Sequence, residues 1–326
     1  MMQPTDVAAR TPGRAHRLPR VSVLVPAYNA QSYLADALDS ALSQSYRSFE
    51  VIVVDDGSTD ATGAIARSYA YRSNGRVRLV RQANAGLPAA RNAAIAVARG
   101  EFFALLDSDD VWMPNHLAHA VAALDADPTV GLVHANIERM DAHGCGLGVP
   151  PRFWNLKPDA YAAIALRHEH VSCPTAVFRR ACVDDVGGFD TRFTGLGCED
   201  RDLWLRIAER WRLRYLDVVS ARYRIHDRNM SGNRERMARA RRALVEKMAR
   251  SPRGAALARH AAAMVHSDLG HELLASGDCG GALRAQLRAL RTRPLTTLAW
   301  RRLLRAAVAA AGAPTAAGAA LAGGAR

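Results

Sequence analysis

The chain has 326 residues, of which 49% are hydrophobic and 23% are charged, with a formal net charge of +13. This length and composition exclude a disordered protein and leave room for one large or two ordinary globular domains. The five cysteines are an odd number without a C-x-x-C pair, which argues against a disulfide framework or a zinc site and favours a cytoplasmic protein with reduced thiols.

The positive charge is concentrated towards the C-terminus. Residues 234–326 contain 17 Lys or Arg and 5 Asp or Glu, so the preceding part of the chain is close to neutral. We expect no nucleic-acid partner, because no zinc finger or aromatic-interleaved basic motif accompanies these charges. Residues 1–20 are basic but lack the apolar core of a secretory signal, and they are predicted to be a disordered lead-in.

The first hundred residues alternate between strand and helix patterns. Helical spacing is clear at Leu34, Leu38 and Leu42. Four apolar runs predict buried strands: residues 21–26, 50–56, 76–82 and 101–106. This alternation predicts an α/β fold with a doubly wound, mostly parallel, Rossmann-like sheet.

The pattern changes beyond residue 130. Strands are predicted at 130–140 and 175–180, on either side of a Gly/Pro-rich loop, and a helix is predicted at 197–211. Two short strands follow, at 213–219 and 221–226. Residues 234–310 form a basic helical pattern broken at Gly277 and Pro294, and residues 311–326 are predicted to be a flexible tail.

Polar residues gather where three predicted strands end: PAYN at 26–29, DDGS at 55–58 and DSDD at 107–110. Ligands bind at the carboxyl ends of strands in such sheets. Three carboxylates within four residues repel one another unless a positive group lies among them. Two acidic loops at one sheet edge therefore favour a binding site over a simple helix-capping loop.

Six motifs then point to a family. They are VSVLVPAYNA, VIVVDDGSTD, NAGLPAARNAAIAVARGEFFALLDSDDVWMP, VGGFD, CEDRDLWLR and YRIHDRNMS. In order and spacing they resemble the bacterial family 2 inverting glycosyltransferases of the GT-A fold, over about residues 21–232. The resemblance implies a nucleotide-binding half at about 21–112, an acceptor half at about 113–232, and a helical extension at 233–310 outside the family core.

The resemblance also implies a nucleotide-sugar donor, Mn²⁺ or Mg²⁺, and a saccharide or lipid-linked acceptor in cell-surface polysaccharide or glycoconjugate synthesis. Tyr28 and Asp56 suit a pyrimidine, which favours UDP. The implied metal ligands are Asp107 and Asp109 of the D-x-D motif, with His226. Nucleotide contacts are implied for these residues: Pro26, Tyr28, Asn29, Asp55, Asp56, Asn84, Gly86, Arg91, Asp107 and Ser108.

Glu199 and Asp200 match the acidic pair of the family, with Asp200 as the base. A carboxylate in the first turn of a helix also favours the helix dipole, which is the structural alternative for Asp200. Asp202 is predicted to be an i,i+4 partner of Arg206. His226 could equally be a satisfied polar residue after a strand. Tyr28 could be ordinary strand-end packing, but a contact with the base is favoured.

Two other functions stay open. A nucleotidyltransferase would carry a Gly-rich loop after the first strand, which PAYNA lacks, and a non-catalytic nucleotide-sugar-binding protein would not need both acidic pairs. The basic tail either packs as a solvated helix or contacts the inner face of the membrane. Residues 306–325 are uncharged but Ala/Gly-rich with Pro314, so no membrane span is expected.

Overall fold

The computed structural model describes residues 18–150, 159–166 and 171–311. The predicted lead-in and tail lie almost wholly outside these residues, as does part of the predicted Gly/Pro-rich loop. The strands are β1 (Val21–Ala27), β2 (Phe49–Asp56), β3 (Val77–Gln82), β4 (Phe102–Leu105), β5 (Val111–Trp112), β6 (Val130–Met140), β7 (Gly146–Gly148), β8 (Val177–Arg179) and β9 (Arg212–Arg224). The helices are α1 (Leu34–Leu42), α2 (Thr62–Arg72), α3 (Leu87–Val97), α4 (His116–Ala126), α5 (Ala160–Ala165), α6 (Arg180–Val186), α7 (Glu199–Ala208), α8 (Arg234–Met248), α9 (Pro252–Ala275), α10 (Cys279–Thr292) and α11 (Thr297–Ala310).

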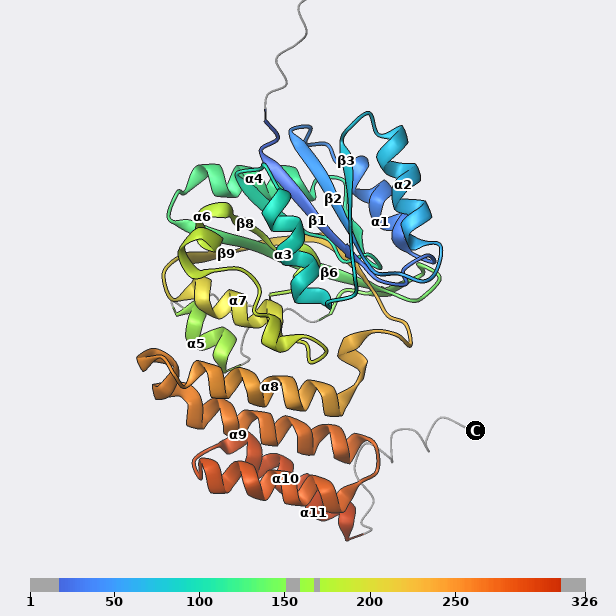
Figure 1. The fold of residues 1–326 in the computed structure, drawn as a ribbon. Helices are drawn as coiled ribbons and strands as arrows, with labels where there is room; N and C mark the ends of the chain where they lie inside the picture. Colours follow the sequence, from blue (N-terminus) through green and yellow to red (C-terminus); the bar gives the residue numbers. More distant parts are fainter. Residues whose placement is uncertain (1–17, 151–158, 167–170, 312–326) are drawn as a thin grey trace, which may run out of the picture.

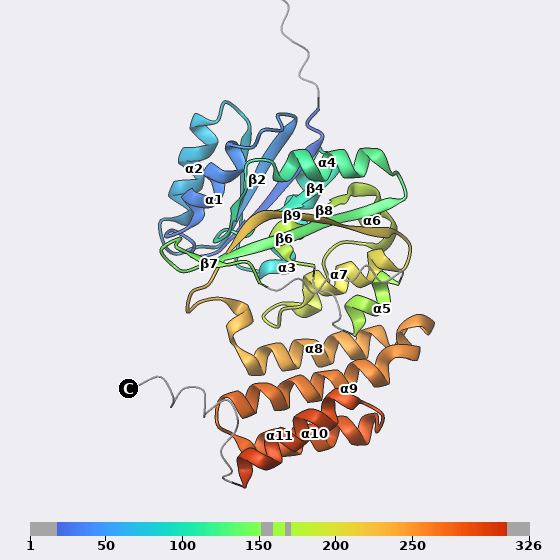
Figure 2. The ribbon, with the colours of Figure 1, turned by 180° about the vertical axis from the view of Figure 1, so that it is seen from behind.

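The described strands form one mixed sheet in the order β3-β2-β1-β4-β8-β6-β9-β5, with β7 beside β6. Its first four strands are parallel, and all residues of β1 and β2 are buried, as their unbroken apolar runs predict. Val23 and Val25 of β1 face α1, α2 and α4, whereas Leu24 faces α3 and α7. Figures 1 and 2 show these two helical layers from opposite sides.

The second half of the sheet departs from the parallel pattern. Strand β8 runs antiparallel to both β4 and β6, while β6 and β9 are parallel. The prediction of two short strands after α7 is wrong, because β9 is continuous over 13 residues. Its register against β6 shifts between Leu216 and Ala221, and such bulges interrupt the alternation of side chains without ending the strand.

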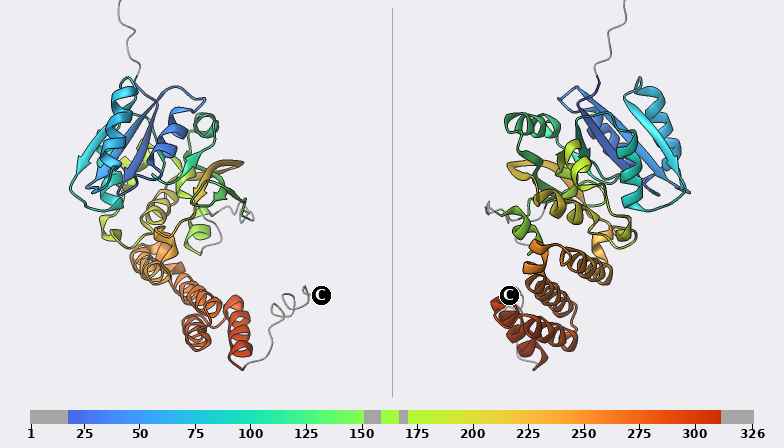
Figure 3. Two further views of the ribbon diagram at one scale, coloured as in Figure 1. Left: turned by 90° about the vertical axis from the view of Figure 1, so that its right-hand side faces the viewer. Right: turned by 60° about the vertical axis from the view of Figure 1, so that its left-hand side comes forward.

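Helices α8 to α11 stack away from the sheet (Figure 1, and from the side in Figure 3). The predicted breaks fall where expected, with Gly277 between α9 and α10 and Pro294 between α10 and α11. Among the described residues no helix is both long and apolar enough to cross a membrane. The proposed division of the chain at residue 232 stays a prediction.

The extension shares an apolar core with the helix that carries the acidic pair. Leu203 and Ile207 of α7 are fully buried and belong to one apolar cluster with Ala240 and Leu244 of α8 and Ala261 of α9. Helix α7 is therefore held between the sheet and the extension.

Candidate active site

Each carboxylate of the DSDD loop has its own partner from outside the loop. Asp107 Oδ1 accepts a hydrogen bond from Arg91 Nη2 at 2.7 Å. Asp109 Oδ2 lies 3.0 Å from His226 Nε2. Asp110 Oδ1 accepts the backbone N–H of Arg224 at 2.9 Å. These partners offset the repulsion that the sequence pattern implies.

Arg224, at the end of β9, is a positioning residue that the sequence did not single out. Its side chain is 3% exposed, and it donates to the backbone oxygen of Asp109 at 2.9 Å and to the carboxylate of Asp36 at 2.9 Å. Burial, together with the charges of Asp109 and Asp107, holds the pKa of Asp110 well above its usual range. The only available signal was its position two residues before His226.

Arg91 connects the two acidic motifs. It lies on α3 with 1% of its surface exposed, and its Nη1 donates to Glu199 Oε1 at 2.6 Å while Nη2 binds Asp107. Nη2 also lies 3.0 Å from the Sγ of Cys173. The contacts of Arg91 are therefore with protein groups, and direct contact with a nucleotide stays a prediction.

The backbone before α7 turns sharply to present the acidic pair. Cys198 has a φ of 66°, in the left-handed region that few non-glycine residues adopt. Glu199 is 4% exposed and directed at Arg91, whereas Asp200 is partly exposed. Burial raises the pKa of Glu199 to about 7 and also raises the pKa of Asp200, in both cases against the opposing effect of Arg91.

Asp202, on the same helix, is paired with cations other than Arg91. It binds Arg206 at 2.8 Å, which confirms the predicted i,i+4 contact, and it also binds Lys247 of α8 at 2.5 Å.

At the nucleotide end of the predicted site, Asp55 and Asp56 are buried, and both are hydrogen-bonded to protein groups. Asp55 accepts the N–H of Ser58 at 3.0 Å and binds Arg81 at 3.0 Å. Asp56 accepts the N–H of Gly86 at 2.8 Å. In this structure the two aspartates shape the loops after β2 and β3, and their contacts with base and ribose stay predictions.

Other predicted nucleotide residues surround these loops. Tyr28 is 52% exposed at the end of β1, next to the buried Pro26. Asn29 accepts the N–H of Thr59 at 2.9 Å, so it ties the first loop to the second. Asn84 is exposed and Ser108 is partly exposed.

Gly86 caps α3 with a φ of +87°, and a Cβ there would lie 2.5 Å from Thr194 Cγ2. Glycine is therefore required at this position, because the left-handed backbone conformation disfavours other residues and Thr194 leaves no space for a side chain.

The acidic loop fits a divalent cation that is shared with a substrate. Within the described ranges no three His, Cys, Asp or Glu residues are placed to enclose a metal ion. Asp107 and Asp109 offer hard oxygen ligands beside His226, and burial together with Asp107 raises the pKa of Asp109, which indicates a site short of positive charge. Mg²⁺ commonly binds one or two carboxylates and completes its shell with substrate phosphates and water, so the residues present fit.

The fold is of the GT-A-like class, as comparison with solved glycosyltransferase structures shows. S. aureus TarS, residues 1–349 in complex with UDP-GlcNAc, superposes with a TM-score of 0.63 at 21% identity, covering 90% of this chain and 92% of that one. The mannosyltransferase PcManGT from Pyrobaculum calidifontis, in complex with GDP-Man and Mn²⁺, gives a TM-score of 0.58 at 28% identity, covering 94% and 90%.

The chain belongs to glycosyl transferase family 2, whose family model matches residues 22–186. The UDP-Glc:alpha-D-GlcNAc-diphosphoundecaprenol beta-1,3-glucosyltransferase WfaP of Escherichia coli is 27% identical over 216 residues, which are 66% of this chain and 80% of that protein. The chain spans between 20% and 65% of the length of three other curated relatives. Two of them are uncharacterized glycosyltransferases and one is an uncharacterized protein.

Proposed function

We propose that this glycosyltransferase is metal-dependent and inverting, and that it moves a sugar from a UDP-sugar to an acceptor hydroxyl. The observation that carries the proposal is that the neighbouring carboxylates of Glu199 and Asp200 have different surroundings. Glu199 is bound to Arg91, while Asp200 is partly exposed and has no ion pair among the described residues. A carboxylate that is held rigidly, is accessible and has a raised pKa suits a general base.

In this mechanism Asp200 accepts the proton of the acceptor hydroxyl as that oxygen attacks the anomeric carbon. The bond to the diphosphate breaks on the opposite face, so one displacement inverts the anomeric centre. Asp107 and Asp109 would hold the cation together with the diphosphate of the donor and water, with His226, the predicted third ligand, beside Asp109. Bound there, Mn²⁺ or Mg²⁺ supplies positive charge to the departing diphosphate.

The donor and acceptor are proposed on separate observations. The exposed ring of Tyr28 at the end of β1 provides a surface on which a base can stack. The complexes of the two structural neighbours contain different nucleotides, UDP in one and GDP in the other. The name of WfaP specifies a lipid-linked saccharide acceptor, which supports a saccharide or lipid-linked acceptor and a role in cell-surface polysaccharide or glycoconjugate synthesis.

A panel of UDP-, GDP- and dTDP-sugars, incubated with and without Mn²⁺, tests the proposal. We expect a UDP-sugar to be consumed with release of UDP, and NMR of the transferred sugar to show an inverted anomeric centre. Retention of configuration would exclude the inverting mechanism. Consumption of a nucleotide sugar only when pyrophosphate is added, with formation of a nucleoside triphosphate and a sugar 1-phosphate, would indicate a nucleotidyltransferase. Donor binding without turnover would indicate a non-catalytic binding protein.

A further inference from the structure

The last helix of the extension carries a stripe of exposed apolar side chains. Trp300, Leu304 and Val308 are 55%, 68% and 37% exposed, and their spacing of four residues places them along one face of α11. The opposite face is buried, with Ala299 and Ala306 almost fully covered. Figure 3 shows α11 at the end of the stack that lies farthest from the sheet.

Other large apolar side chains on the neighbouring segments are also exposed. Leu295, in the turn before α11, is 85% exposed, and Leu287 of α10 is 45% exposed. Among the described residues, six of the thirteen exposed large hydrophobic side chains lie between residues 287 and 308. Exposed apolar residues that are clustered rather than scattered mark an interaction surface.

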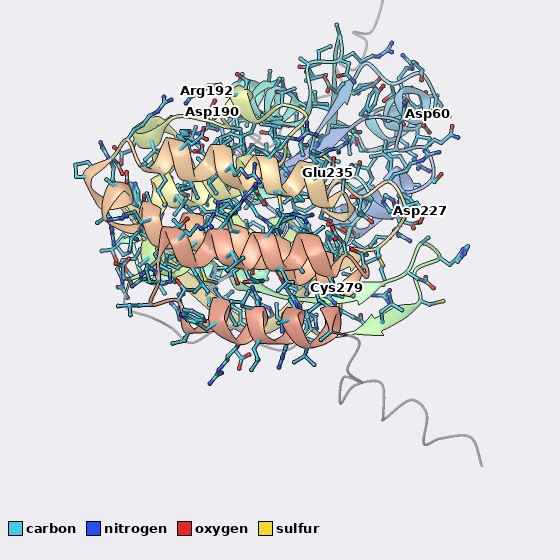
Figure 4. All side chains as sticks on the ribbon, turned by 90° about the horizontal axis from the view of Figure 1, so that it is seen from below. Asp60, Asp190, Arg192, Asp227, Glu235 and Cys279 are labelled. Carbon is cyan, nitrogen blue, oxygen red and sulfur yellow. The ribbon has the colours of Figure 1, made fainter. Side chains whose placement is uncertain are left out.

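All charged side chains in this part of the chain are basic. Residues 279–326 contain eight arginines and no Asp or Glu. Arg301 and Arg305 are exposed beside the stripe and form no ion pair with any described residue, whereas Arg302 is turned inward to Asp268 at 2.8 Å. In Figure 4, side chains with nitrogen tips project from the outer edge of the helical extension.

We infer that this surface, the outer face of α11 with Leu295 and the exposed residues of α10, docks on an anionic phospholipid bilayer. An apolar stripe bordered by arginines is the pattern of helices that lie in a membrane interface, where the aliphatic stems of Arg pack on apolar surface and their guanidinium groups reach lipid phosphates. The indole of Trp300 suits the headgroup level of the membrane interface, where Trp is enriched. Its Nε1 donates a 2.8 Å hydrogen bond to the backbone oxygen of Pro294, which fixes the ring.

A second copy of the chain is a poorer occupant of this surface. A two-fold contact would bury this segment against its own copy, and residues 279–326 contain no Asp or Glu that could pair with Arg301 and Arg305 of the other chain. In Figure 1 the strands β1 and β2 run towards the side on which the extension lies, so docking through α11 would bring the sheet edge that carries the site towards the membrane.

Co-sedimentation of the full-length protein with vesicles tests the inference. The probes are phosphatidylcholine vesicles with and without phosphatidylglycerol. Wild type should bind only the anionic vesicles, and both Arg301→Glu/Arg305→Glu and Trp300→Ser/Leu304→Ser should weaken binding by about tenfold or more. The matched control, Arg67→Glu/Tyr71→Ser, changes an exposed arginine and a 93% exposed tyrosine on α2, and it should bind as wild type does.

Donor hydrolysis and circular dichroism, measured without lipid, report whether each variant is folded, and they separate this inference from the proposed catalytic function. Equal binding to neutral and anionic vesicles, or equal loss in the α2 control, would overturn the inference. So would a wild-type dimer that the α11 variants convert to a monomer without any binding to vesicles, since the surface would then be an interface between copies.

Discussion

Arg91 Nη1 donates to Glu199 Oε1 at 2.6 Å, and this contact joins helix α3 to the first turn of α7 across 108 residues of sequence. The other guanidinium nitrogen binds Asp107 at 2.7 Å. A buried guanidinium can bind two carboxylates at once because its donors are fixed in one plane. Arg91 therefore holds the D-x-D loop and the acidic pair in a fixed relation.

Arg91→Lys should lower the free energy of unfolding by about 3 kcal/mol, because a single ammonium group cannot satisfy both carboxylates and a buried ion pair is left broken. Chemical denaturation measures the loss. Arg212→Lys is the matched control, since Arg212 is 72% exposed and its pair with Asp127 lies at the surface, where solvent screening leaves it little effect on stability. Equal losses in the two variants would contradict the role assigned to Arg91.

Glu199 should make the stability of the protein depend on pH. Its pKa rises from 4.5 to about 7 on folding, so the folded state holds the proton more tightly than the unfolded state. The resulting stabilisation is complete below pH 4.5 and is lost as the pH rises towards 7, by at most about 3 kcal/mol.

Denaturation midpoints measured across this pH range should fall less steeply in Glu199→Gln than in wild type. Some slope should remain, because burial also raises the pKa values of Asp109, Asp110 and Asp200. An unchanged slope in Glu199→Gln would show that this residue does not titrate there.

Truncations should show where the extension becomes dispensable. A chain ending at residue 233 loses the α8 residues that cover α7, and it also loses Lys247, whose ammonium binds Asp190 at 2.7 Å. We expect that chain to be insoluble or to bind nucleotide poorly. A chain ending at residue 294 loses only α11 and the residues beyond it, and it should keep the nucleotide affinity of wild type by calorimetry. Normal affinity in the shorter chain would contradict this packing.

The sequence predicts the strands and helices of the parallel half well, because buried strands and amphipathic helices leave clear periodicities. It also predicts that the acidic loops meet at one sheet edge. It does not predict the partners of the carboxylates, since a contact such as that of Arg91 with Glu199 depends on how α3 and α7 pack and has no local pattern. The continuous β9 was missed for a related reason, because its bulge interrupts the alternation that defines a strand.

Asp109→Asn should remove most of the gain in nucleotide affinity that Mn²⁺ or Mg²⁺ provides, while the fold survives. An amide keeps the size of the side chain but removes the charge that a hard cation prefers. Calorimetric titration of UDP with and without metal measures the gain. His226→Gln should reduce it less, because the carboxylate remains. Equal affinity with and without metal in wild type would contradict the metal site.

Asp200→Asn should lower transfer by about 100-fold or more while donor affinity stays within a few-fold. The substitution preserves size but removes basicity, and a base that acts in the transition state contributes little to holding the donor. Leu203 and Ile207, both fully buried, hold α7 in place, and the left-handed turn at Cys198 sets where the helix begins. Single-turnover transfer, measured alongside calorimetric binding of the nucleotide, separates the two effects.

Two neighbours on α7 serve as controls, because each variant removes one carboxylate charge from the same helix. Glu199→Gln should reduce transfer less than Asp200→Asn, since Glu199 faces Arg91 rather than the open side of the site. Asp202→Asn weakens the contacts with Arg206 and Lys247, so it should lower stability and leave transfer nearly unchanged. If Glu199→Gln proves more damaging to transfer, or Asp200→Asn retains near-normal transfer, then the base is not Asp200, and the carboxylate beside Arg91 becomes the group to test.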